Sequence, residues 1–143
     1  MKPYEIFEHT ADIGLKIHGR NLEELFRHAA LGLFDLITDT AQIKASPNAR
    51  PETVDLRLEA ADEGELLLKW LRELLFLFSA RKFVPYDFAF SEINSAALKA
   101  RVSTAVFDPS AHEQKYEVKA VTYHEFKIRH DASGWHAQVI LDI

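Results

Sequence analysis

The sequence has no cysteine and little glycine or proline, with five of each among its 143 residues. The absence of cysteine excludes disulfide bonds, thiolate zinc sites and cysteine nucleophiles. Neither G-x-G-x-x-G nor G-x-x-x-x-G-K-[ST] occurs, and five glycines leave little room for a loop that binds nucleotide phosphates. The G-x-S-x-G motif of serine hydrolases is absent too. The common nucleotide-binding and nucleophilic classes therefore have no signature here.

Basic side chains are also fewer than acidic ones: the chain has 17 basic and 22 acidic residues, which give a net charge of −5. This balance argues against a protein that binds nucleic acid by neutralising phosphates along its surface. It suits a basic partner instead. With 48% apolar residues the chain can bury a substantial core, and its length predicts a single domain over residues 1–143.

Long hydrophobic runs are missing as well. The most apolar stretch, residues 66–78, is 13 residues long and contains Lys69, Arg72 and Glu73. A membrane-spanning helix needs about 20 apolar residues, so this stretch is predicted to be a core helix. The first residues show no apolar segment of a signal peptide. We therefore expect a cytoplasmic protein without a membrane partner.

Two helices are predicted from apolar residues that recur at steps of three and four. The first follows Asn21 and extends to Ile37, and the second follows Asp62. Each of these two polar residues has a glutamate three positions further on, which is the pattern of a capping box. The second helix is apolar on more than one side. That is typical of a helix buried between layers.

Strands are predicted where apolar and polar residues alternate, and residues 38–52 are predicted as a loop because they contain two prolines and few apolar residues. The fold class is α+β, with two helices packed on a mostly antiparallel β-sheet. The predicted strands are residues 4–8, 13–18, 54–58, 88–93, 97–106, 116–121, 124–130 and 135–143.

Histidine is frequent, with seven residues, but its spacing does not predict a zinc site. His124, His130 and His136 are six positions apart, and six strand residues span roughly 20 Å. Neighbouring members of this series on one strand therefore cannot share a metal ion. Neither predicted helix contains an H-x-x-x-H or H-E-x-x-H pair.

Two acidic features remain, one near each end of the chain. Asp12 lies in the HTAD segment between two strands, where its carboxylate can either bind a hard cation or accept backbone amides in a turn. At the other end, Asp142 precedes Ile143, whose α-carboxylate would add a second negative group beside it. Two such groups repel each other, and a divalent cation would neutralise them. The alternative is simply a last strand at a sheet edge.

Three motifs occur in order along the chain: HTADIG at residues 9–14, EVKAVTYH at residues 117–124 and DI at residues 142–143. Together with the two helical segments, they resemble the archease family over essentially the whole chain. The resemblance implies an archease-like fold and a non-catalytic partner of the RtcB-type RNA ligase. That ligase joins tRNA exon halves and other RNAs with 2′,3′-cyclic or 3′-phosphate ends. The partner is expected to promote guanylylation of the ligase histidine, to allow multiple turnover and to widen nucleotide use.

The resemblance also implies a divalent-cation site formed by Asp12, Asp142 and the terminal carboxylate of Ile143. Carboxylate ligands favour Ca²⁺ or Mg²⁺ over softer metals, and flexible ligation favours Ca²⁺, because Mg²⁺ requires near-octahedral geometry. His9 and Thr10 are candidates to orient Asp12.

Lys119 and His124, in the EVKAVTYH motif, are candidates for contact with the partner. Lys119 can pair with a phosphate or an acidic surface, or it can be a solvated lysine at a strand edge. No direct sequence-specific binding of nucleic acid is expected.

Two other functions stay open at this point. One is a general chaperone-like modulator of RNA-processing enzymes such as tRNA methyltransferases. The other is a metal-dependent hydrolase acting on small phosphates, against which the sequence offers no second metal site and no general base beside Asp12.

Overall fold

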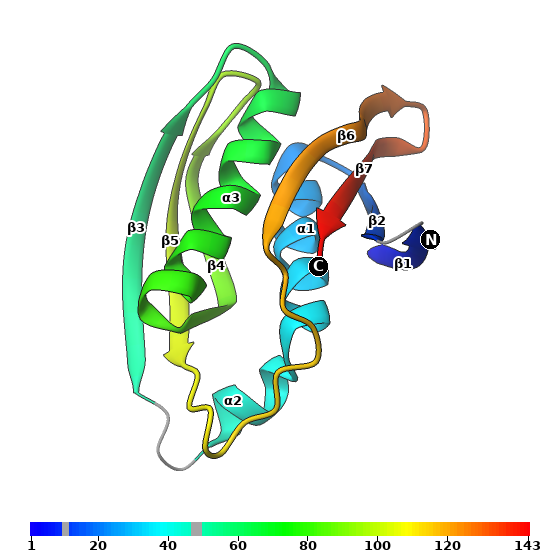
Figure 1. The fold of residues 1–143 in the computed structure, drawn as a ribbon. Helices are drawn as coiled ribbons and strands as arrows, with labels where there is room; N and C mark the ends of the chain where they lie inside the picture. The colour runs from blue at the N-terminus through cyan, green and yellow to red at the C-terminus, as the bar shows by residue number, and fades with distance from the viewer. Residues whose placement is uncertain (10–11, 47–49) are drawn as a thin grey trace.

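The computed structural model describes residues 1–9, 12–46 and 50–143. These residues form two antiparallel sheets with helices between them (Figure 1). The helices are α1 (Leu22–Ile37), α2 (Thr40–Ala45) and α3 (Glu63–Arg81). The strands are β1 (Tyr4–His9), β2 (Asp12–Gly19), β3 (Pro51–Glu59), β4 (Phe83–Ile93), β5 (Ala97–Val106), β6 (Ala120–Asp131) and β7 (Gly134–Asp142). One sheet has the order β1-β2-β7-β6 and the other the order β3-β5-β4. The predicted α+β class with antiparallel strands is confirmed.

Helices α1 and α3 lie in the middle layer, and each packs against strands of both sheets (Figure 1). The prediction that the second helix is buried between layers is therefore confirmed. Trp70 of α3 is fully buried, and its Nε1 donates a hydrogen bond of 2.9 Å to the carbonyl oxygen of Phe26 in α1. No helix in the described part of the chain is long and apolar enough to cross a membrane.

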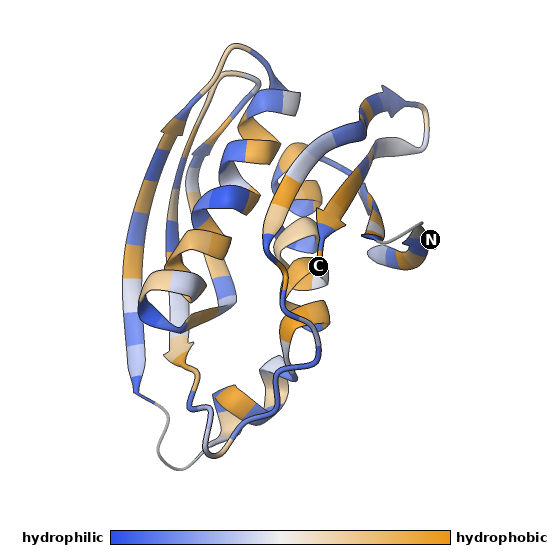
Figure 2. Cartoon of the chain, viewed as in Figure 1, coloured by the Kyte–Doolittle hydropathy of each residue, from blue (hydrophilic) through white to orange (hydrophobic). Residues whose placement is uncertain are grey.

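The outer faces of the sheets are more polar than the faces that cover the helices. Figure 2 shows hydrophobic and hydrophilic residues alternating along β3. In β2, Leu15 and Ile17 are buried against the helices, whereas Lys16 between them is exposed. This alternation is expected of an antiparallel sheet with one face on the core and the other in water.

The predicted starts of the two long helices are confirmed, with one difference in the capping bonds. The side chain of Asn21 accepts a hydrogen bond of 2.8 Å from the backbone nitrogen of Glu24. The Glu24 carboxylate in turn accepts from the backbone nitrogen of Arg20, one residue before the position expected in a capping box. Asp62 and Glu65 repeat this arrangement at the start of α3.

The loop predicted over residues 38–52 is wrong for residues 40–45, which form α2, and for residues 51–52, which begin β3, whereas residues 47–49 lie outside the described part of the chain. Asp39 caps α2 by accepting a hydrogen bond from the backbone nitrogen of Gln42. Ile43 is the one buried residue of this short helix. A single large apolar side chain in six residues produces no clear periodicity, so the sequence pattern gave no sign of the helix.

Strand β4 begins five residues earlier than predicted and includes Pro85. The strand lies at the edge of its sheet, and its register shifts between Pro85 and Asp87. An edge strand with a bulge tolerates proline, because no neighbouring strand requires the missing N–H donor.

The two strands predicted at residues 116–121 and 124–130 are a single strand, β6, which begins only at Ala120. Its pairing with β7 is interrupted between Thr122 and Lys127, and Glu125 in this interval has a φ of 50°. The interruption breaks the alternation of side chains. The sequence pattern therefore resembled two separate strands.

Candidate metal and partner-binding site

The two acidic residues singled out in the sequence meet in the four-stranded sheet. The antiparallel register of β2 and β7 places Asp12 opposite Asp142. Residues directly opposite each other in such a pair project from the same face, with their Cβ atoms about 4.5–5.5 Å apart. Asp12 is partly exposed and Asp142 is exposed. The fold therefore brings two carboxylates from opposite ends of the chain together at an accessible position.

The third strand at this position is β6, whose first residue, Ala120, pairs with Asp142. The backbone nitrogen of Lys119 donates a hydrogen bond of 2.7 Å to the carbonyl oxygen of Asp142. This bond fixes the backbone of Lys119 next to the acidic pair, and its side chain is exposed. The EVKAVTYH motif is therefore joined directly to the end of β7.

The structure describes only some of the remaining residues of the predicted cation site. Ile143 directly follows β7 and packs, partly buried, against the core. His9 is opposite Asp12 in the register of β1 and β2. The side chain of His9 and the whole of Thr10 lie outside the described residues. Their predicted role in orienting Asp12 stays a prediction.

His124 is not brought to the acidic pair. It is exposed and lies in the interrupted part of β6, four residues beyond Ala120. Four strand residues span about 13 Å. Contact of His124 with a partner stays a prediction that is separate from the cation site.

The donor chemistry of the acidic pair fits a hard divalent cation. Carboxylate oxygens are preferred ligands of Ca²⁺ and Mg²⁺, and like charges directly opposite on two strands repel each other unless they are neutralised. Over residues 1–9, 12–46 and 50–143, no three side chains of His, Cys, Asp or Glu are gathered around a common position for a metal ion. The role of Ile143 as a third ligand stays a prediction.

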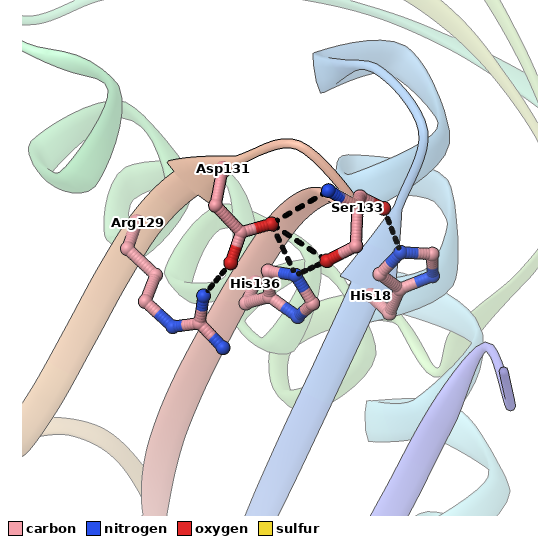
Figure 3. Close-up of polar contacts among 5 residues, drawn as sticks. All are labelled: His18, Arg129, Asp131, Ser133 and His136. Atoms are coloured by element: carbon pink, nitrogen blue, oxygen red, sulfur yellow. Dashed lines mark hydrogen bonds and ion pairs between the residues drawn. The ribbon is translucent and has the colours of Figure 1, made fainter.

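A second polar cluster lies at the opposite end of β7, in its hairpin with β6 (Figure 3). Asp131 accepts hydrogen bonds from the hydroxyl and the backbone nitrogen of Ser133, at 2.6 and 2.8 Å. It also forms an ion pair with Arg129 and contacts Nε2 of His136 at 3.2 Å. The hydrogen bonds from Ser133, followed by those from Arg129 and His136, hold the pKa of Asp131 well below its usual range.

The presence of serine, histidine and aspartate in this cluster does not make it a nucleophilic triad. In a triad, the carboxylate and the hydroxyl bond to different nitrogens of the imidazole ring. Here the hydroxyl of Ser133 lies 2.8 Å from Nε2 of His136, and the Asp131 carboxylate contacts the same nitrogen. The hydroxyl also bonds directly to Asp131. The cluster therefore braces the hairpin and positions Arg129.

The two histidines that meet, His18 and His136, are not a pair from the series His124, His130 and His136. His136 pairs with His18 of β2, and their ring centroids are 5.0 Å apart. Nε2 of His18 lies 2.9 Å from the carbonyl oxygen of Ser133 (Figure 3). The alternation along β2 and β7 would have assigned each histidine to the solvent-facing side. That the two are opposite each other depends on the register of distant strands, which one sequence does not reveal.

The arrangement of two antiparallel sheets around a helical layer has counterparts among solved structures. The solution structure of Methanobacterium thermoautotrophicum protein 1598 matches with a TM-score of 0.78 and 33% identity over the full length of both chains. The crystal structure of a Thermotoga maritima archease, described as a possible chaperone, matches with a TM-score of 0.66. It is 22% identical and covers 97% of this chain and 96% of that one, and at this identity it supports the fold alone.

The sequence comparisons identify the family. The model of the Archease protein family matches residues 4–143. The archease of Pyrococcus furiosus is 38% identical over 147 residues, covering all of both chains. That of Methanosarcina mazei is 37% identical over 146 residues, covering 99% of this chain and 97% of the relative. The chain belongs to the archease family, as its motifs indicated.

Proposed function

We propose that this chain is a non-catalytic activator of an RtcB-type RNA ligase in tRNA splicing and RNA repair, acting in the cytoplasm. It promotes guanylylation of the ligase, allows multiple turnover and widens nucleotide use. Membership of the archease family supports this proposal. The observation that carries it is the pairing of Asp12 with Asp142, because it joins two of the three family motifs at one accessible place.

The third motif contributes the expected contact with the ligase. Lys119 is exposed and is fixed through its backbone beside Asp142. A lysine in this position can pair with an acidic or phosphate-bearing group of the ligase. His124, four residues beyond Ala120 in β6, would make a second and separate contact with the ligase. These roles require no catalytic residue of this chain, and the geometry of Ser133, His136 and Asp131 offers no activated nucleophile.

The turnover of the ligase tests this proposal. A cognate RtcB-type ligase is supplied with GTP and an RNA that ends in a 3′-phosphate, with or without this protein. The proposal predicts about one round of ligation per ligase without the protein and many rounds with it. If the number of rounds is the same in both reactions, the chain is not an activator of this ligase.

We further propose that Asp12, Asp142 and the α-carboxylate of Ile143 hold a divalent cation, Ca²⁺. The ion supplies the positive charge that offsets the repulsion between these carboxylates. Two roles are compatible with the position of the pair. The residues present the ion to the ligase, or they use it only to fasten the end of β7 to the start of β2.

The variant Asp12→Ala separates the two roles. In the intact protein, Ca²⁺ at about one hundred times its Kd is expected to stabilise the fold by about 2.7 kcal/mol. Asp12→Ala is expected to lose the rise in melting temperature that Ca²⁺ causes in the intact protein. If the variant without Ca²⁺ melts as the intact protein does and yet fails to activate the ligase, the ion acts at the contact. A joint loss of stability and activation indicates the fastening role.

A second candidate is a chaperone-like modulator of other RNA-processing enzymes, such as tRNA methyltransferases. The description of the Thermotoga maritima relative as a possible chaperone favours testing it. The two functions predict different partners. Aggregation and activity of a tRNA methyltransferase, measured with and without this protein, should not change if the ligase is the partner.

A further inference from the structure

The outer face of the four-stranded sheet holds a pocket of about 330 Å³ at the end of the sheet away from Asp12 and Asp142. We call it the basic pocket. One carboxylate, that of Glu5, is part of its lining. The basic side chains around it are those of Lys2, Lys16, Lys127, Arg129, His18 and His136. Such a concentration of positive groups is unexpected on a protein with a net charge of −5.

Strand register brings these side chains together. Two neighbouring rows of cross-strand partners run over β2, β7 and β6, and they consist of Lys16, Gln138 and Lys127, and of His18, His136 and Arg129. Adjacent rows on one face of a sheet are two residues, or about 7 Å, apart. The positive groups of β2 and β6, with the imidazole rings of His18 and His136 beside them, therefore converge on one concave position.

The one carboxylate in the lining, that of Glu5, belongs to the cross-strand partner of Lys16. Among the described residues, no carboxylate lies within salt-bridge distance of Lys16 or Lys127. The ammonium group of Lys16 instead lies 5.3 Å from the centre of the Phe7 ring. Like charges gathered in a concavity raise the local concentration of anions. The positive charge and concave shape of the pocket therefore favour a negatively charged ligand.

Arg129 adds a positioned guanidinium to this site. Its ion pair with Asp131, which is itself held by Ser133, fixes the direction of the side chain (Figure 3). A guanidinium has five N–H donors, and one carboxylate uses only part of them. Donors of Arg129 therefore stay available for a ligand, in the planar geometry that matches phosphate oxygens.

We propose that the basic pocket binds a phosphate group. A phosphate or pyrophosphate concentrates two or more negative charges in a small volume, which matches several converging amines, whereas a side-chain carboxylate brings only one. The volume is at the lower end for small-molecule sites and is large enough for a chain of two or three phosphates. The phosphate belongs either to a small anion or to the backbone of an RNA strand.

This site is distinct from the proposed cation site. Asp12 is four residues from Lys16 and six from His18 along β2, which corresponds to about 13 and 20 Å. Phosphate binding is a property of the isolated chain and does not rest on ligase activation. The failure of either proposal therefore leaves the other one intact.

A titration of the ¹⁵N-labelled protein with pyrophosphate, followed by the amide resonances at low ionic strength, tests the proposal. The expected shifts are confined to the residues of the two rows, including Gln138. The double variant Lys16→Gln/Lys127→Gln should bind at least about tenfold more weakly, because it loses two charge-assisted contacts to the phosphate. The matched control Arg57→Gln/Lys99→Gln removes the same charge from exposed positions on the three-stranded sheet and should bind nearly as the intact protein does.

The second titration uses a short single-stranded RNA without a terminal phosphate. Shifts at the same residues that grow with RNA length identify the backbone as the source of the phosphate, whereas shifts with pyrophosphate alone identify a small anion. The proposal is overturned if neither probe gives localised shifts at millimolar concentration. An equal loss of affinity in the two double variants overturns it too, and so does binding of an oligoglutamate peptide without binding of either phosphate probe.

Discussion

Gly19, the last residue of β2, lies under the first turn of α1, and its missing side chain is what allows this approach. A Cβ atom at Gly19 would stand 2.3 Å from the backbone nitrogen of Leu25 and 2.7 Å from its Cα. Because these are backbone atoms of a helix, the helix as a whole would have to move. The strand-to-helix connection therefore depends on glycine at this position.

We expect Gly19→Ala to lower the free energy of unfolding by about 1–3 kcal/mol, the usual range for overpacking. Denaturant unfolding measures the change. Gly32→Ala is the control, since the nearest atoms there belong to the Tyr4 side chain, at 3.0–3.3 Å, and can shift. Equal losses in the two variants would contradict the account of Gly19.

Tyr4 links β1 to α1 through a hydrogen bond of 2.9 Å from its hydroxyl to the carboxylate of Asp35. Burial, together with this bond and the charge of Asp35, raises the pKa of Tyr4 to about 12. The folded state therefore holds the phenolic proton more tightly than the unfolded chain does, whose tyrosine pKa is about 10. The resulting contribution to stability is complete below about pH 10 and is lost as the pH rises toward 12.

Tyr4→Phe should therefore lose about 0.5–1.5 kcal/mol at neutral pH, the usual net value of one hydrogen bond. Above about pH 10, the stability of the variant should fall less steeply than that of the intact protein. Unfolding free energies measured across this range test the prediction. Parallel curves for the two proteins would show that Tyr4 does not titrate with folding.

Among the elements, α3 is joined through Trp70 to α1 and to the three-stranded sheet. Its ring is fully buried, with centroids 5.7 and 5.4 Å from those of Phe88 and Phe90 in β4. On the other side, its Nε1 bonds to Phe26 of α1. One side chain thus contacts both the neighbouring helix and the three-stranded sheet.

Trp70→Phe is expected to destabilise the protein by about 2–4 kcal/mol, through the lost hydrogen bond and the cavity left by the smaller ring. Phe76→Leu on the same helix is a suitable control, because Phe76 is 60% exposed and should change stability by less than about 0.5 kcal/mol. A loss at Trp70 no larger than at Phe76 would contradict its connecting role.

The elements that could be predicted from sequence are those whose signals are local. Asn21 and Asp62 mark helix starts because their side chains accept from the third residue of their own helices. Helix α2 was not predicted, because Ile43 is its one buried residue and a single such residue gives no periodic pattern. The extent of β6 was not predicted, because the interruption near Glu125 changes which face of the sheet successive side chains occupy.

At the scale of the whole molecule, the same distinction applies to the candidate site. Asp12 and Asp142 could be identified as candidates from their motifs. That they lie opposite each other depends on the pairing of β2 with β7, two strands from opposite ends of the chain. The convergence of Lys16 and Lys127 depends on this pairing and on that of β7 with β6, and it was not predicted. Both sites lie on the face of the four-stranded sheet that points away from the helices.

The number of ligation rounds per RtcB-type ligase, measured with Asp142→Asn, tests the central claim most directly. The matched control is Asp55→Asn, which changes an exposed aspartate on the three-stranded sheet. The account predicts many rounds with the intact protein and with Asp55→Asn, and about one round with Asp142→Asn at an unchanged fold. Many rounds with Asp142→Asn would contradict the account, because the acidic pair would then have no part in activation.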